Sequence, residues 1–242
     1  MKHLLPILLF ILAFLDVPLY CASVQKATYE VSFGILERIG TADALLEIRD
    51  DQSYSIRIEA RTEGFAKLLT NNRIEVYESH GIVVKGKLIP NKFVKIRKTD
   101  AKKRIRIYTF DHPNKNIILE NINSEDWKEE PVSYYAQEDI LSLFFNLKHY
   151  PRTPENQSLY ALGGNKKDGK IDVVFTDKNN TFQMKEVLGM ESGEFVKVIL
   201  NEPIFSSEKG ELYVNLDENG LCEKAVLKDV LLFGDIVGKR IR

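Results

Sequence analysis

Residues 164–170, Gly-Asn-Lys-Lys-Asp-Gly-Lys, come closest in this sequence to a motif with known chemistry. They follow the G-x-x-x-x-G-K spacing of loops that hold nucleotide phosphates. Ile171 stands where such a loop needs a Ser or Thr to hold Mg²⁺. The apolar run that follows predicts a strand, so no helix N-terminus would face a phosphate. Asp168-Gly169 therefore predicts a hairpin turn, and we expect no nucleotide binding.

Residues that could bind a metal or catalyse a reaction are sparse. Residues 216–223 resemble the start of a calcium loop but lack its later ligands, and Asn219-Gly220 is typical of a hairpin turn. His80, His112 and His149 have no second His or Cys at metal-ligand spacing, and no Gly-x-Ser-x-Gly motif occurs. We predict no metal, no cofactor, no catalytic residue and no enzymatic activity. A hydrolase whose residues meet only in space stays open as a third alternative.

The chain has two cysteines, Cys21 and Cys222. Cys21 lies in the predicted cleavage zone of an export signal, so removal of that signal leaves Cys222 alone and no internal disulfide can form. Cys222 falls in a predicted strand, which favours a buried, inert thiol over a catalytic one.

A basic segment covers residues 92–106. One interpretation is a surface that contacts anionic lipid head groups or an acidic partner, for which we select Lys95, Arg97, Lys102, Lys103 and Arg104. The other is a solvated edge hairpin, on which lysines block pairing with another sheet. Nucleic acid is not expected as a partner, because no stacking aromatic residues are interleaved with these charges.

Alternation of apolar and polar residues with a period of two dominates the chain and predicts antiparallel strands. The alternating runs are 27–33, 41–49, 53–61, 104–110, 116–122, 170–177, 181–189, 194–201, 210–217 and 222–233. Helical spacing is confined to about 64–72 and 137–149. We therefore predict a mostly β fold: one large curved antiparallel sheet or half-open barrel, bridged by the second of two short helices.

The two predicted helices carry an excess of large apolar residues. Phe65, Leu68, Leu69, Leu141, Phe144 and Phe145 are our candidates for contact with an apolar ligand. Phe144 and Phe145 are about 100° apart around a helix, so one can pack on the sheet while the other faces the short helix or a cavity. Plain core packing of these side chains is the alternative.

The N-terminus reads as an export signal. Lys2 precedes an apolar run from Leu4 to Leu15, and small residues follow at 21–23. We predict a cleaved signal peptide at residues 1–23, one antiparallel β domain at 24–242 and a periplasmic location. The formal net charge is −1, so no overall field attracts nucleic acid or membrane.

Three sequence stretches in order carry a family resemblance: Tyr-Glu-Val-Ser-Phe-Gly near residue 30, residues 54–69, and residues 77–93 with Tyr-Glu-Ser-x-Gly followed by Leu-x-Pro-x-x-Phe. With Asp-x-Leu-Ser at 139–142 and a closing hairpin at 210–236, they resemble the bacterial family called domain of unknown function 3108. The resemblance implies a periplasmic β protein without an assigned reaction. By fold analogy it is similar to envelope lipoprotein carriers, with helices against the concave side of a curved sheet.

Together these features favour an exported, non-enzymatic protein that binds an apolar or lipid-like ligand in envelope maintenance. The alternative is a periplasmic interaction or assembly protein with a fully packed sheet, which binds an envelope protein through a sheet edge or the basic segment. A ligand cavity distinguishes the two.

Overall fold

The structure is a computed structural model that describes residues 22–34, 36–123, 126–153, 155–176, 181–200, 210–228 and 234–242. The predicted signal peptide lies outside the described residues except for Ala22 and Ser23. Ser23 already begins the first strand.

One sheet of 15 strands forms the body of the described chain, and it is not closed into a barrel. In chain order the strands are β1 (Ser23–Phe33), β2 (Leu36–Ile48), β3 (Ser53–Thr62), β4 (Ile74–Val84), β5 (Lys87–Lys98), β6 (Lys103–Asp111), β7 (Asn116–Asn123), β8 (Trp127–Pro131), β9 (Glu138–Asp139), β10 (Gln157–Leu162), β11 (Lys170–Phe175), β12 (Glu194–Leu200), β13 (Gly210–Leu216), β14 (Cys222–Leu227) and β15 (Ile236–Arg240). The prediction of one large curved sheet is confirmed.

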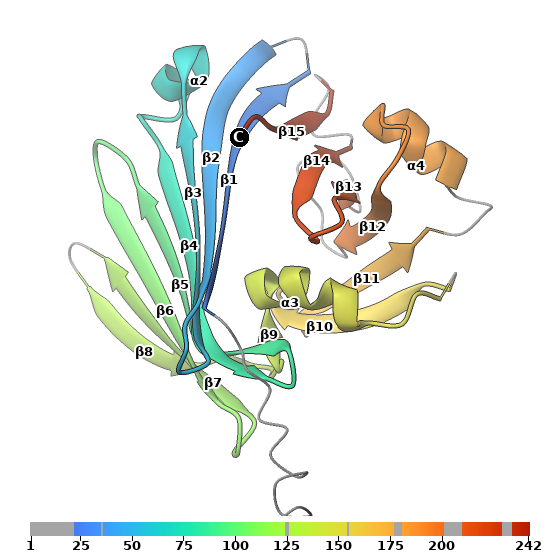
Figure 1. The fold of residues 1–242 in the computed structure, drawn as a ribbon. Coiled ribbons are helices and arrows are strands. Elements are labelled where there is room, and N and C mark those ends of the chain that lie inside the picture. The colour runs from blue at the N-terminus through green and yellow to red at the C-terminus, as the bar shows by residue number, and fades with distance from the viewer. Residues whose placement is uncertain are drawn as a thin grey trace, which may run out of the picture.

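The strand order joins the two halves of the chain through its last strand. β1 to β8 lie side by side in sequence order, and β15 pairs with β1 on one side and with β14 on the other. β14 back to β10 continue the sheet, and the short β9 adds a parallel pair at its end. Figure 1 shows the sheet curving so that both halves face a common hollow.

Three α-helices accompany the sheet in the described residues: α2 (Gly64–Leu69), α3 (Ile140–Asn146) and α4 (Thr181–Leu188). A 3₁₀ turn at Leu147–His149 extends α3, so the predicted helix at 137–149 is confirmed but starts at residue 140. The strand expected at 181–189 is wrong. Met184 and Leu188 are one helical turn apart and both are buried, so tertiary packing selects the helical period.

Helix α3 lies in the hollow and packs on both halves of the sheet (Figure 1). Leu141 belongs to a core cluster with Tyr54, Ile56 and Phe93 of the N-terminal half. Leu143 and Leu147 belong to a second cluster formed with strands β10 to β13. The face of β3 to β6 that carries Tyr54 and Phe93 is therefore the concave face.

We expected α2 to pack on the concave face, and it does not. None of its residues is buried, and Phe65, Leu68 and Leu69 are 64%, 75% and 67% exposed. Figure 1 places α2 at the rim of the sheet, far from α3. Of the two alternatives given for Phe144 and Phe145, contact with this helix is wrong, because the link between β3 and β4 emerges at the opposite end of the sheet.

A glycine permits a tight reversal and a proline favours a sheet edge, but in residues 76–93 the chain does not reverse at Gly81 and Pro90 does not lie at a sheet edge. Gly81 and Pro90 face each other across a β-bulge between β4 and β5, and a Cβ at Gly81 would lie 1.9 Å from the Ile89 carbonyl oxygen. Gly81 thus permits close approach of the strands, and the bulge accommodates the proline. The chain reverses at Lys85-Gly86, where both φ angles are positive.

Candidate functional site

The start of α3 is fixed by a buried capping box. Asp139 Oδ1 accepts hydrogen bonds from the backbone N–H groups of Leu141 and Ser142, at 2.8 and 2.9 Å. Ser142 Oγ in turn accepts from the Asp139 backbone N–H at 3.0 Å. This reciprocal pattern satisfies donors that a helix start otherwise leaves unpaired. It explains the Asp-x-Leu-Ser sequence at 139–142.

The same carboxylate ties α3 to the sheet. Ser79 Oγ donates to Asp139 Oδ2 at 2.6 Å, and the Tyr54 hydroxyl lies 2.9 Å from Ser79 Oγ. Tyr54, Ser79 and Asp139 are all at most 1% exposed. Burial raises the pKa of Asp139 to about 6, although its hydrogen bonds oppose the shift.

The end of α3 is held by a second buried group. Asn146 accepts from the Leu88 backbone N–H and donates to the Leu88 carbonyl, both at 2.9 Å. It also donates to Glu138, and Tyr150 donates to the other oxygen of the same carboxylate at 2.7 Å. Asn146 and Asp139 are fully buried, and their hydrogen bonds position the helix.

A small cavity of about 130 Å³ lies beside the end of α3. Phe144 and Phe145 line it with their rings edge to face, 5.4 Å apart. Phe144 packs on the C-terminal cluster and Phe145 on the N-terminal cluster, while Leu141 is buried and does not line the cavity. Sites for small organic ligands usually enclose about 300–1,000 Å³. This cavity is therefore too small to enclose an acyl chain.

Beyond α3, the concave face turns from apolar to cationic. Strand register places Phe93 beside Tyr108, then Lys95 beside Arg106, then Arg97 beside Arg104 on the same face. Lys95, Arg97, Arg104 and Arg106 line a pocket of about 90 Å³ together with Glu75, Tyr77 and Ile96. We call this the cationic pocket.

A second pocket of about 200 Å³ lies next to the first, and Glu75 lines both. Val31, Gly40 and Ala60, small or apolar residues of β1, β2 and β3, line it. We call this the apolar pocket. Thr62 and Arg73 also line it, and they flank α2 in the chain, so α2 lies at the same end of the sheet as this pocket.

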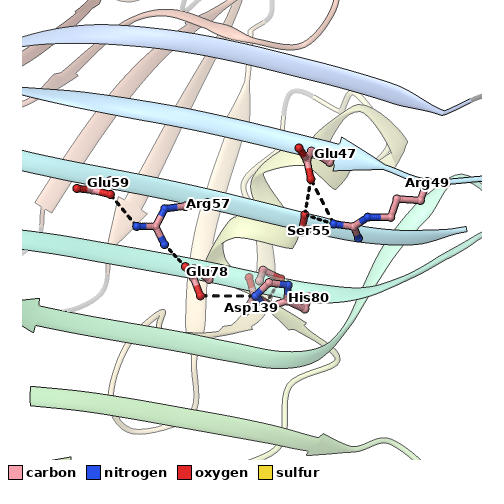
Figure 2. A network of polar contacts seen from close by, with 9 residues as sticks. Glu47, Arg49, Ser55, Arg57, Glu59, Glu78, His80 and Asp139 are labelled. Atoms are coloured by element: carbon pink, nitrogen blue, oxygen red, sulfur yellow. Dashed lines mark hydrogen bonds and ion pairs between the residues drawn. The ribbon is translucent and has the colours of Figure 1, made fainter.

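The convex face of the same strands has a different charge pattern, shown in Figure 2. Glu59, Arg57 and Glu78 form a chain of ion pairs across β3 and β4, and His80 lies 3.6 Å from Glu78. Arg49 pairs with Glu47 at 3.2 Å. Charges of opposite sign compensate each other here, as on an ordinary solvated surface. The concave face, by contrast, concentrates cations.

A match to a family model shows which protein family the chain belongs to. The model described as "Protein of unknown function (DUF3108)" matches residues 28–220. The chain belongs to the DUF3108 family. The motif residues Ser79 and Asp139, which lie 60 positions apart in this DUF3108 chain, meet in the hydrogen bond that anchors α3.

One solved structure with a similar fold is the crystal structure of a beta-barrel-like protein of domain of unknown function DUF1849 from Brucella abortus. The identity is 11% and the TM-score 0.50, over 90% of the DUF3108 chain and 95% of the solved chain. At this identity the likeness concerns the fold alone. No curated protein matches the DUF3108 chain.

The residues predicted for anion contact are split by the structure. Lys95, Arg97 and Arg104 lie on the concave face, whereas Lys103 pairs with Lys98 on the convex face and Lys102 precedes β6. The basic segment is not an edge hairpin, because β7 and β8 lie outside it and β8 forms the edge. Arg106 lies in the basic segment but is not among the five residues selected from it, and Glu75 lies outside the segment. Alternation within 104–106 was the signal that could have found Arg106.

Other candidate chemistry in the described part of the DUF3108 chain is limited. His112 is held by hydrogen bonds to the Tyr135 hydroxyl and the Pro90 carbonyl, both at 2.7 Å. Cys222 is in β14 as expected, and burial raises the pKa of its thiol to about 12. No group of metal-binding side chains occurs among the described residues. None of the helices placed by the structure is long and apolar enough to cross a bilayer.

Proposed function

We propose that this protein is a non-enzymatic carrier of the cell envelope that binds a lipid-like ligand on the concave face of its sheet. The observation that carries the proposal is the junction of an apolar pocket and a cationic pocket at Glu75. An apolar surface beside a concentrated charge matches a ligand with an apolar tail and an anionic head.

The position of the two pockets supports this assignment. They lie on the part of the concave face that α3 leaves uncovered, where Ala42, Ala44, Ile58 and Ala60 are only partly buried. The three exposed apolar side chains of α2 extend the apolar surface at the rim. A ligand tail that leaves the apolar pocket would contact them, which retains Phe65, Leu68 and Leu69 as candidate ligand residues.

The alternative is an interaction protein that holds no ligand. The small cavity of about 130 Å³ beside Phe144 and Phe145 favours it, because the interior around α3 is close to fully packed. In that case the apolar side chains of α2 would contact another envelope protein.

Binding of the neutral fluorescent probe N-phenyl-1-naphthylamine separates the two functions. We expect saturable binding to wild type. Ala60→Trp, which fills the apolar pocket, should weaken it at least about tenfold. Thr109→Trp is the matched control, because Thr109 is exposed on the convex face of β6. Absence of probe binding, together with no lipid in native mass spectra of protein from its own periplasm, would leave the interaction protein as the function.

A further inference from the structure

We propose that the cationic pocket is a subsite for the phosphate group of an amphiphilic ligand. This inference rests on the proposed function and specifies the head group. Four cations and one carboxylate line the pocket, a formal charge of +3. A phosphate monoester, which carries close to two negative charges at neutral pH, compensates this charge better than a carboxylate does.

The cations are arranged in a way that a strand pair alone does not favour. Arg97 lies directly opposite Arg104, and Lys95 lies directly opposite Arg106. Like charges directly opposite each other on one face destabilise a strand pair. A sheet that keeps two such pairs side by side gains from an anion between them.

The guanidinium groups of Arg97 and Arg104 have hydrogen-bond donors that are available for a ligand. The Nε atom of Arg97 donates to Glu75 at 2.7 Å, and that of Arg104 donates to Asn123 at 3.0 Å. Within the described residues, the terminal nitrogens of these two side chains have no protein acceptor. Both planar forks are therefore positioned by one bond and available for a bidentate contact with phosphate oxygens.

Arg106 adds an independent observation. Its Nε atom is buried and has no hydrogen-bond partner, and the side-chain oxygen of Asn121, opposite it on β7, is buried and unpartnered too. Arg106 also lies close enough to Tyr108 to oppose the rise that burial causes in the pKa of that tyrosine. Buried polar groups in native proteins are nearly always paired. A bound phosphate ester supplies an acceptor for Arg106, and a water that bridges it to Asn121 supplies a donor for the Asn121 side-chain oxygen.

Glu75 gives the pocket its directionality. It accepts from Arg97 and from the Tyr77 hydroxyl, both at 2.7 Å, and it separates the cationic pocket from the apolar pocket. Its negative charge disfavours an anion at the junction, so the phosphate is directed to Arg104 and Arg106. The tail is then directed toward Val31 and Ala60.

Inorganic phosphate and a lipid phosphate ester both carry the negatively charged phosphate group that this pocket would bind. Isothermal titration with four ligands distinguishes them: 1-oleoyl lysophosphatidic acid, monooleoylglycerol, oleic acid and inorganic phosphate, each below its aggregation concentration. We expect lysophosphatidic acid to bind at least about tenfold more tightly than each of the other three.

Charge-removing variants locate the site. Arg104→Gln and Arg106→Gln should each weaken lysophosphatidic acid binding about tenfold and leave monooleoylglycerol binding unchanged. Lys103→Gln, the same charge change on the convex face of the same strand, should have no effect. If Arg106→Gln lowers the melting temperature, Arg104→Lys tests the bidentate contact, since it keeps the charge but removes the fork.

Each other result contradicts a defined part of the proposal. Equal affinity for lysophosphatidic acid and monooleoylglycerol would show that there is no phosphate subsite while the lipid carrier stands. Tighter binding of oleic acid would make the subsite one for carboxylate. Inorganic phosphate as tight as lysophosphatidic acid would make free phosphate the ligand. Failure of all three lipids to bind would overturn the proposed function itself.

Discussion

At the scale of single residues, Asp139 links the two most distinctive sequence motifs of this protein. It caps α3 and receives the hydroxyl of Ser79 from the sheet. Its carboxyl group is completely buried, and no cation contacts it directly within the described structure. The group is satisfied by neutral donors only, and this leaves it with a raised pKa.

The raised pKa predicts a pH dependence of stability. The folded pKa of about 6 lies above the value of about 3.9 for Asp in an unfolded chain. Between these pH values the native state holds a proton that the unfolded state has released. The contribution of Asp139 to the free energy of unfolding is therefore highest below pH 4 and falls, by on the order of 2–3 kcal/mol, as the pH rises through about 6.

Asp139→Asn should remove this fall, because an amide does not titrate and can still accept from the helix N-terminus. Urea unfolding of both proteins between pH 4 and pH 8 measures it. The free energy of unfolding of the variant, relative to wild type, should increase between pH 4 and pH 7. A constant difference between the two proteins over this range would contradict the assignment of the raised pKa to Asp139.

At the scale of elements, the two predicted helices have opposite roles. Helix α3 is capped, buried and bonded to the sheet at both ends. Helix α2 has no side-chain cap and buries none of its residues. Replacing large apolar side chains on a short exposed helix costs little stability, so stability does not explain their presence. Their presence points to a function at the rim.

Serine substitutions on α2 test that role. Phe65→Ser or Leu68→Ser should change the free energy of unfolding by no more than about 0.5 kcal/mol, because both side chains are exposed. Each should weaken binding of N-phenyl-1-naphthylamine several-fold. Phe182→Ser is the matched control, since Phe182 is 76% exposed on α4 in the other half of the molecule. An equal effect of all three variants would show that α2 has no special part in binding.

At the scale of the whole molecule, one sheet carries two core clusters, and α3 joins them. Ile140 packs against both clusters, Phe145 against the first and Phe144 against the second. β15, which lies between β1 and β14, joins the halves a second time through backbone hydrogen bonds. Loss of packing on one side of α3 should therefore affect both halves.

Phe145→Ala tests this coupling. The variant should lose less than the about 3–5 kcal/mol typical of a fully buried Phe, because the side chain is partly exposed at the small cavity. Phe145 packs against the core cluster that contains Tyr54 and Ile56 of β3. Hydrogen exchange should therefore show lower protection of the backbone amides of β3, and an equal decrease in β13 of the other half. A decrease confined to the N-terminal half would show that the two clusters unfold independently.

Much of this arrangement follows from local sequence. Alternation with a period of two placed Tyr54 with Ile56, and Arg57 with Glu59, on opposite faces of β3, and the structure confirms both sets. Asn219-Gly220 forms the predicted turn between β13 and β14. These features are local because strand pleating and turn conformation depend on residues adjacent in the chain.

Only the tertiary structure decided which of the two faces of each strand lies inside. Alternation with a period of two places Lys95 and Arg97 on one face of β5, and Arg104 and Arg106 on one face of β6. The curvature of the sheet and the position of α3 make that face the concave one. The meeting of Ser79 with Asp139 depends likewise on the global strand order. The sequence by itself determined most of the strands, the two faces of each and the family, whereas tertiary packing made residues 181–188 a helix. The pocket required long-range pairing, because no local pattern encodes the direction in which a sheet curves.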